Sequence, residues 1–303
     1  MPFSFACPNC GLETLVDDEF AGQDGPCAGC GKTVSIPYRV GLPLAVSGTP
    51  VDTPRVKPGT IAVIVVLSIL GACAVFAILM VLVFPSFQVA REVIDKSSCR
   101  SNLQRIAEAL KQYEIEHGTL PPAFIADSAT GKPMHSWRVL ILPQLGESGL
   151  YTRYNFSEPW DGPNNTQLMS LMPDVFACPS DPDAKTKCET NYMVLVGPKT
   201  LFPGAKPATI AGITDDAETT ILVAEAPVAG IVWTAPKDLN AARMQFTINT
   251  GSTGEMGSYH PSGINAVMAD GTSRFFEDNF PTDYLQGMST QQGGEDIPWE
   301  VLQ

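Results

Sequence analysis

One uncharged stretch restricts the possible folds of this chain more than any other feature. Residues 60–84, TIAVIVVLSILGACAVFAILMVLVF, contain no Asp, Glu, Lys or Arg. A helix of this length would extend about 36 Å, enough to cross a hydrocarbon core of about 30 Å with some tilt. A buried helix of a water-soluble protein would normally have a polar face, and a secretory signal would be shorter and nearer the N-terminus. We therefore predict a transmembrane helix at residues 60–84.

Two cysteine pairs precede this stretch. The sequences CPNCG at residues 7–11 and CAGCG at residues 27–31 place two C-x2-C pairs 16 residues apart. This spacing is typical of a tetrahedral zinc site with four thiolate ligands. Residues 1–40 are too few to bury a large core, so the metal would stabilise their fold. We predict a structural zinc ribbon that binds one Zn²⁺, with a redox dithiol or disulfide bonds as the alternatives. The predicted ligands are Cys7, Cys10, Cys27 and Cys30.

The cysteines also indicate the orientation of the chain. Thiolates persist best as zinc ligands in a reducing compartment, which places the N-terminus in the cytoplasm and the residues after 84 outside it. Residues 41–59 are rich in Pro and Gly and are predicted to be a linker. The formal net charge is −13, and Lys32 and Arg39 are the only basic residues of the ribbon. We therefore expect no nucleic acid partner.

The segment after the apolar stretch predicts more helix and then strands. Between residues 87 and 117, apolar residues recur largely at three- and four-residue steps, and Gly118 and Pro121 end the pattern. The apolar stripe of such a helix requires a sheet to cover it. The sequence thus predicts an α+β fold in which the transmembrane helix continues into a long helix packed on an antiparallel sheet. The strand candidates are residues 136–145, 191–197, 219–226, 229–235 and 264–276, the last being a hairpin that turns at Asp270-Gly271. For Leu140–Leu145, a helix is the alternative.

Several segments in combination are similar to a known family. They are CRSNLQRIAEALKQYEIEHGTLPPAF, SWRVLILPQLGESGLYTRYNFSEPWDGPNN, FACPSD, LQGMSTQQGGE and the H-x9-D-G pattern formed by His260, Asp270 and Gly271. Over residues 60–295, the chain resembles a bacterial prepilin-like family of unknown function that is identified by a C-terminal H-x9-D-G motif. The resemblance implies a pseudopilin-like exported domain at residues 85–303 and no established enzymatic activity.

The start of the apolar stretch departs from the prepilin pattern. Family members carry a G-F-T-L-x-E signal that is cleaved after the glycine, whereas Gly59 here is followed by Thr60, with Ile64 at the fifth position in place of glutamate. In pilins that glutamate pairs with the new N-terminus of a neighbouring subunit. We therefore predict a permanently anchored, single-pass protein of the bacterial cytoplasmic membrane rather than a processed filament subunit.

His260 and Asp270 raise the question of catalysis. A catalytic arrangement would need His260 to meet groups such as Ser258, Asp270 or Glu255. A strand of about five residues spans roughly 17 Å, so a strand between His260 and Asp270 would keep the two side chains apart. We interpret His260 as a packing or capping residue of the loop before the hairpin, and Asp270-Gly271 as its turn. A metal- or ligand-binding role of His260 is the alternative.

The exported cysteines and one carboxylate in a predicted strand complete the candidate residues. The resemblance matches Cys99 and Cys178 to family positions, which implies a disulfide between them, whereas a local bond between Cys178 and Cys188 is the competing choice. Glu225 follows an apolar run in VAEA and could meet Arg274. We favour a partly exposed salt bridge there over a binding site.

Together these features predict a non-enzymatic membrane protein. It would act as an interaction or assembly component of the bacterial envelope, linked through protein partners to a secretion or pilus-like system. A closed four-cysteine site leaves no coordination position for a substrate, so the zinc would be structural. The alternative is an envelope receptor for a small ligand or glycan, with the ribbon as a cytoplasmic interaction module. Four aromatic residues would suit such a receptor if exposed, and they would equally suit a loop packed on the sheet: Tyr151, Tyr154, Phe156 and Trp160.

Overall fold

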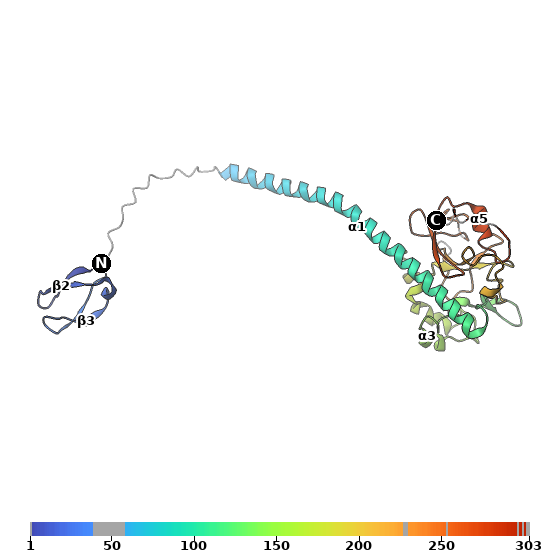
Figure 1. The fold of residues 1–303 in the computed structure, drawn as a ribbon, viewed down its shortest axis with the longest axis horizontal. Coiled ribbons are helices and arrows are strands. Elements are labelled where there is room, and N and C mark those ends of the chain that lie inside the picture. The colour runs from blue at the N-terminus through green and yellow to red at the C-terminus, as the bar shows by residue number, and fades with distance from the viewer. Residues whose placement is uncertain are drawn as a thin grey trace. The chain divides into compact units, whose positions relative to one another are not determined.

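The computed structural model describes residues 2–38, 58–226, 230–252, 254–295, 297–298 and 300, and in the first helix the side chains at 58, 60–62, 64 and 82–90 lie outside the description. The chain divides into two units between Ala72 and Cys73, within the first helix. Figure 1 shows the strands of the N-terminal unit and, in the C-terminal unit, the end of the long helix among strands and short helices. The predicted linker lies outside the described residues except for Pro58 and Gly59. These two residues already belong to the first helix, since proline is well tolerated in a first helical turn.

The secondary structure consists of short strands, short helices and one long helix. The strands are β1 Phe3–Ala6, β2 Glu13–Val16, β3 Asp24–Pro26, β4 Thr33–Ser35, β5 Phe124–Ala126, β6 Pro133–Ser136, β7 Tyr192–Met193, β8 Leu195–Val196, β9 Ile221–Glu225, β10 Leu239–Asn240, β11 Gly263–Met268 and β12 Ser273–Glu277. The α-helices are α1 Pro58–His117, α2 Trp137–Leu140, α3 Ser148–Arg153, α4 Ala184–Lys187 and α5 Thr282–Gly287, and the 3-10 helices are η1 Asp18–Phe20, η2 Asn165–Leu171, η3 Asp174–Phe176 and η4 Ile210–Gly212.

The N-terminal residues form two antiparallel hairpins, β1–β2 and β3–β4. Each hairpin carries one cysteine pair in its turn, at residues 7–10 and 27–30. The glycine after each pair is left-handed, with φ of +73° at Gly11 and +72° at Gly31. Their N–H groups donate to the carbonyls of Cys7 at 2.9 Å and Cys27 at 2.8 Å. Glycine is required there because a Cβ disfavours this conformation.

The helix α1 is continuous over 60 residues. Every residue from 65 to 81 is exposed. The predicted span at residues 60–84 lies wholly in α1, although its side chains at 60–62, 64 and 82–84 are outside the description. Within the described residues, no helix offers a stretch that is both long enough and apolar enough to cross a membrane.

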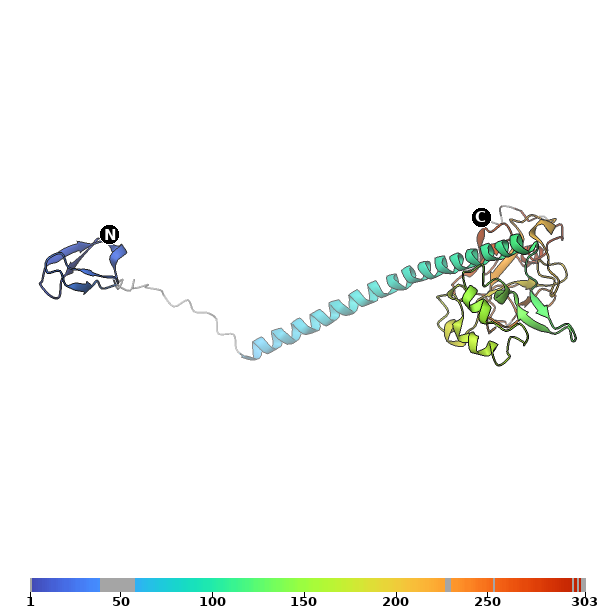
Figure 2. The ribbon, with the colours of Figure 1, turned by 90° about the horizontal axis from the view of Figure 1, so that it is seen from below.

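The C-terminal part of α1 packs on a four-stranded antiparallel sheet with the order β12-β11-β9-β7. Leu103, Ile106 and Leu110 are fully buried, and they share one core with Val223 of β9 and Val267 of β11. Figure 2 shows this end of the helix running into the C-terminal unit. The expected long helix on an antiparallel sheet is therefore present, since the apolar stripe of the helix covers one face of the sheet.

A second apolar layer covers the opposite face of the sheet. Ile264 and Met268 of β11 belong to this second core, together with Leu285 of α5 and Met288. Because both faces are covered, β9 and β11 are buried along their whole length. Strands of this kind have nearly continuous apolar sequences rather than a strict alternation.

Two of the five strand predictions are wrong and one is confirmed in full. Residues 136–145 form the end of β6, the helix α2 and a turn, because the side chain of Ser136 accepts the N–H of Arg138 at 3.3 Å and caps the helix. Residues 230–235 form no regular strand, apart from an isolated bridge at Val232, and residue 229 lies outside the description. The hairpin predicted at 264–276 is confirmed as β11 and β12.

A buried ion pair joins α2 to the strands. The side chains of Arg138 and Asp238 are 0% and 2% exposed, and Nη2 of Arg138 lies 2.6 Å from Oδ1 of Asp238. The same guanidinium donates to the carbonyl of Tyr192 at 2.9 Å, while Asp238 accepts from the indole of Trp137 and from the N–H of Val194. Burial of the pair is therefore matched by hydrogen bonds on both partners.

We expect Arg138→Met to lower the free energy of unfolding of the C-terminal unit by about 3–5 kcal/mol, because it leaves the Asp238 carboxylate buried without its cation. Urea denaturation measures the change. Arg153→Met, at an exposed arginine, should change the free energy by no more than about 0.5 kcal/mol. The double variant Arg138→Met/Asp238→Leu should regain most of the loss. Equal losses of stability in Arg138→Met and in the control Arg153→Met would contradict the role of the ion pair.

Candidate functional site

The four N-terminal cysteines converge on one point. Sγ of Cys7 lies 3.8 Å from Sγ of Cys30, and Sγ of Cys10 lies 3.7 Å from Sγ of Cys27. All four sulfur atoms lie within 4.8 Å of one another. Zn–S bonds of about 2.3 Å at tetrahedral angles would place sulfur atoms about 3.8 Å apart. The cluster can therefore hold a metal ion and has the dimensions of a zinc site.

Backbone groups support ligation by these thiols. The N–H of Asn9 donates to Sγ of Cys7 and the N–H of Gly29 donates to Sγ of Cys27, both at 3.4 Å. The N–H groups of Gly29 and Cys30 lower the pKa of the Cys27 thiol to about 6. A thiolate is the form that binds a metal, so this environment favours the ligand state of Cys27. At Cys10, the backbone of Leu12 lowers the pKa of the thiol, but the neighbouring thiols raise it to about 12.

The C-terminal unit contains a second polar cluster, centred on His260. The side chain of His260 is fully buried in the loop before β11. Its Nδ1 lies 2.6 Å from Oε1 of Glu92 in α1, and its Nε2 lies 3.7 Å from Oε1 of Glu225 at the end of β9. Nε2 also lies 3.4 Å from Sγ of Cys178. The imidazole thus links the long helix, the sheet and the segment around Cys178.

Glu225 is an internal carboxylate, 1% exposed. Its Oε2 accepts the backbone N–H of Asn265 at 2.7 Å, and Nδ2 of Asn265 donates to the same carboxylate at 3.2 Å. Burial raises the pKa of Glu225, against the opposing effects of Asn265 and His260. The expected partly exposed salt bridge with Arg274 is wrong, because Glu225 is buried against His260 and Nε of Arg274 donates to the carbonyl of Glu218.

A disulfide lies beside this histidine. Cys99 of α1 and Cys178 are bonded, with their Cα atoms 5.4 Å apart, and both are buried. Of the two pairings left open by the sequence, the structure contains this one, and Cys188 is a free thiol. The ligand atoms of Cys99, Cys178, Glu225 and His260 lie within 4.8 Å of one another.

Asp270 and Gly271 lie elsewhere, at the tip of the β11–β12 hairpin. Oδ1 of Asp270 accepts from the N–H of Thr272 at 2.8 Å and from its hydroxyl at 2.7 Å, and Gly271 has φ of +93°. The carbonyl of Asp270 accepts from Nζ of Lys111 in α1. The strand β11 separates this turn from His260, so the H-x9-D-G motif does not form a single site.

The other partners considered for a catalytic His260 also have structural contacts. Oγ of Ser258 accepts the backbone N–H of His260 at 3.1 Å. The carboxylate of Glu255 accepts the N–H groups of Gln245 at 2.6 Å and Thr247 at 3.2 Å. The geometry around His260 is that of a buried polar link between elements.

Sequence reasoning missed Glu92 as the partner of His260. A signal was present, because Glu92, Lys96 and Cys99 follow one another at four- and three-residue steps and therefore share one face of a helix. Nζ of Lys96 lies 3.0 Å above the centre of the Phe275 ring of β12. This face of α1 is polar and still lies against the unit, which periodicity of apolar residues alone does not reveal.

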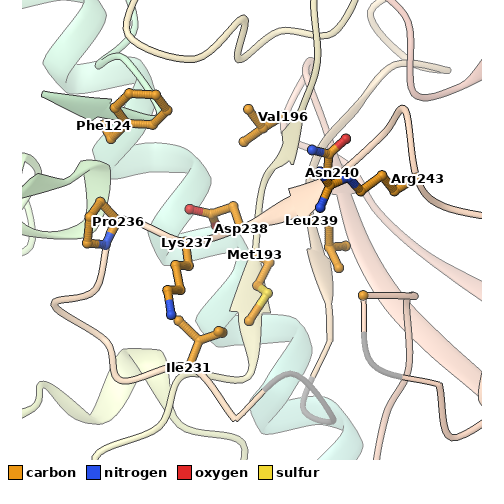
Figure 3. Close-up of a pocket in the computed structure, with 11 residues that line it drawn as sticks. Phe124, Met193, Val196, Ile231, Pro236, Lys237, Asp238, Leu239, Asn240 and Arg243 are labelled. Atoms are coloured by element: carbon orange, nitrogen blue, oxygen red, sulfur yellow. The ribbon is translucent and has the colours of Figure 1, made fainter. Parts of the chain in front are cut away.

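A cavity of about 510 Å³ opens near β8 and β10 (Figure 3). Its wall combines apolar side chains with exposed polar ones. The lining residues are Phe124, Met193, Val196, Ile231, Pro236, Lys237, Asp238, Leu239, Asn240, Arg243 and Gly254. The side chains of Lys237 and Arg243 form no ion pair within the described part of the chain. The cavity therefore has an apolar wall and two available cations.

Of the two roles left open for the aromatic segment, a ligand-binding surface or a packed loop, Tyr151, Tyr154 and Phe156 take the second. Tyr154 is 5% exposed, and its ring centre lies 5.0 Å from that of Phe156. The rings of Tyr151 and Phe156 are 5.4 Å apart, and the hydroxyl of Tyr154 lies 3.0 Å from Nδ1 of the buried His135. These residues stabilise a loop, so any ligand site must be sought elsewhere.

Comparison with known proteins gives one match. Residues 88–236 match the model of the SBP_bac_10 family, described as a protein of unknown function (DUF1559). No curated protein and no solved structure matches the chain. The matched segment contains both disulfide cysteines and ends before His260. The chain is thus similar to a domain family without an assigned function, and its prepilin-like character stays a prediction.

We expect the full-length chain, purified under non-reducing conditions, to hold one zinc, and Cys27→Ser to lose it. The ribbon should then lose its dispersed amide resonances, while the melting of the C-terminal unit stays unchanged because that unit has apolar cores of its own. Metal analysis and NMR measure both effects. Cys73→Ser, at an exposed cysteine of α1, is the matched control and should keep the zinc. Zinc retained by Cys27→Ser would exclude the four-cysteine site.

Proposed function

We propose that this protein is a single-pass component of a bacterial cytoplasmic membrane that works by binding protein partners rather than by catalysis. In this proposal the ribbon lies in the cytoplasm with one structural zinc, and residues 85–303 are exported. Its role is that of an interaction or assembly component of a secretion or pilus-like system.

The observation that carries the proposal is the exposed apolar surface of α1. Large apolar side chains between residues 63 and 81 are 50–73% exposed. Consecutive residues such as Val65, Val66 and Leu67, followed by Ile69 and Leu70, point to all sides of a helix. A partner helix would cover one stripe of this surface, whereas lipid would cover all of it. Since exposure of apolar area to water costs about 25 cal/mol per Å², a membrane is the surrounding that best accounts for the helix.

The continuity of α1 supports the pseudopilin-like part of the proposal. The same helix carries the exposed apolar residues and the buried stripe of Leu103, Ile106 and Leu110 that contacts the sheet. This is the arrangement that the resemblance to prepilin-like proteins implies.

The residues considered for catalysis support a binding role. His260 is fully buried between Glu92 and Glu225, and Asp270 forms hydrogen bonds within a turn. A four-cysteine zinc site has no coordination position for a substrate. These groups stabilise the fold, so surfaces rather than an active site would carry the function.

We expect the double variant Leu70→Arg/Phe76→Arg to be released from bacterial membranes by an alkaline carbonate wash, while the wild type stays in the pellet. Each arginine near the middle of a membrane helix costs about 2.5–3.5 kcal/mol of insertion free energy. Gln104→Arg, which adds the same charge at an exposed position of the C-terminal half of α1, should behave like the wild type.

The intact mass of the membrane-extracted chain provides the second half of this test. A full-length chain with one zinc supports a permanent anchor and an attached ribbon. A chain that begins at Thr60 and lacks zinc would contradict it and would indicate a processed, pilin-type subunit. A wild type released by the carbonate wash would overturn the membrane anchor itself.

The cavity favours a second candidate function, that of an envelope receptor for a small ligand. Phe124, Met193 and Ile231 provide apolar contact area, and Lys237 and Arg243 are exposed cations in a chain with a net charge of −13. Such a wall suits an anionic molecule with an apolar body, for example a medium-chain carboxylate.

For this receptor role, we expect a fluorescent medium-chain carboxylate to bind the full-length protein. The double variant Lys237→Glu/Arg243→Glu should weaken this binding at least about tenfold, because each charge reversal removes an attractive charge. A tenfold change in affinity corresponds to about 1.4 kcal/mol of binding free energy. Fluorescence titration measures the affinity. Lys206→Glu, at an exposed lysine outside the cavity, is the control. Equal affinity of Lys237→Glu/Arg243→Glu and of Lys206→Glu for the carboxylate would exclude the cavity as the binding site.

A further inference from the structure

The buried cluster around His260 contains four groups of the kinds that bind transition metals. The proposed function assigns no metal-binding role to any of them. The Sγ atoms of Cys99 and Cys178, a carboxylate oxygen of Glu225 and a ring nitrogen of His260 lie within 4.8 Å of one another. All four residues are buried. The cluster lies inside the C-terminal unit, beneath α1, and is distinct from the four cysteines of the ribbon.

The imidazole of His260 has the orientation of a metal ligand. Nδ1 lies 2.6 Å from Oε1 of Glu92, and in the tautomer in which an Nδ1–H group donates to this carboxylate, Nε2 has a lone pair available for a metal. Nε2 lies 3.4 Å from Sγ of Cys178 and 3.7 Å from Oε1 of Glu225. A histidine that binds a metal through one nitrogen commonly donates to a carboxylate through the other. Glu92 would fill this supporting position.

The carboxylate of Glu225 is held in the same manner. Its Oε2 accepts the backbone N–H of Asn265 at 2.7 Å, and its Oε1 points to His260. Tetrahedral zinc with bonds of about 2.0–2.3 Å to N, O and S requires ligand atoms about 3.3–3.8 Å apart. The separations of 3.4 and 3.7 Å around Nε2 of His260 fall in this range.

We propose that, when the Cys99–Cys178 disulfide is reduced, the two cysteines bind one Zn²⁺ together with Nε2 of His260 and Oε1 of Glu225. Zinc and the disulfide are then alternative cross-links between α1 and the segment at Cys178. The zinc form would hold α1 in its folded position in a reducing environment, before the cysteines are oxidised.

The chemistry of the exchange balances with a dithiol as the reductant. Two electrons and two protons pass from the dithiol to the disulfide, the S–S bond breaks and two thiols form, while the reductant becomes a disulfide. Binding of Zn²⁺ then releases the two thiol protons. Two thiolates and the Glu225 carboxylate carry three negative charges, so the site has a net charge of −1 when it holds Zn²⁺. Lys96, on the next turn of α1 after Glu92, interacts electrostatically with Glu225 and Glu92 and supplies a nearby cation.

Metal content of the full-length chain tests the proposal. Protein reduced with a water-soluble phosphine, incubated with Zn²⁺ and freed of unbound metal should hold one zinc more than the oxidised protein treated in the same way. The comparison is made on protein whose ribbon already holds one zinc in the oxidised state, so that the additional zinc cannot come from the four N-terminal cysteines. Failure of the proposed membrane function would leave this result unchanged.

Matched variants assign the extra zinc to the cluster. Glu225→Gln keeps the size of the side chain and its contact with Asn265, and His260→Gln removes the imidazole; both should lose the difference of one zinc. Cys188→Ser, which removes a free thiol outside the cluster, should keep it. An extra zinc that persists in Glu225→Gln and His260→Gln, or that disappears in Cys188→Ser, would overturn the assignment.

A second measurement needs no variant and therefore does not depend on whether the variants fold. In the reduced wild type, Zn²⁺ should slow alkylation of Cys99 and Cys178 at least about tenfold, as followed by mass spectrometry of the peptides, and a chelator should restore the rate. Alkylation of Cys188 should not change. Equal rates for Cys99 and Cys178 with and without Zn²⁺ would exclude the site.

Discussion

The apolar stripe on the C-terminal half of α1 is the contact on which the rest of the C-terminal unit depends. Leu103, Ile106 and Leu110 are fully buried against Val223 and Val267 of the two central strands. Burial of side chains of this size contributes roughly 1.5–3 kcal/mol each. A second apolar layer covers the other face of the sheet, so the two central strands are buried on both sides.

Polar links then specify how the helix lies on the sheet. At one end of the contact, Glu92 meets His260 and Cys99 is bonded to Cys178, while near the other end Lys111 donates to the carbonyl of Asp270. Apolar packing is not directional, whereas these contacts require particular pairs of atoms. They explain why the histidine and the aspartate of one motif are both structural although they lie at opposite ends of a strand.

Much of the fold was accessible from sequence patterns. The two C-x2-C pairs specified a cluster with the dimensions of a zinc site, and the alternation around Asp270-Gly271 specified the hairpin, because both patterns are local. The sequence predicts a strand at residues 136–145, whereas the structure has the helix α2 and a turn there. The cap at Ser136 and the ion pair of Arg138 with the distant Asp238 outweigh the preference of a short apolar run for a strand. The cluster around His260 could be predicted only in part, because Glu92 and His260 are far apart in the sequence although their side chains are in contact.

The sequence by itself determined the properties that depend on neighbours in the chain: the cysteine turns, the apolar stretch, the helix that ends at Gly118 and the turn of the last hairpin. Only the tertiary structure decided which cysteine pairs with Cys178, that Glu225 is buried, and that His260 lies between two carboxylates and a disulfide. The physical reason is that these contacts join residues far apart in the chain. Their distances follow from how α1 docks on the sheet, which no local pattern encodes.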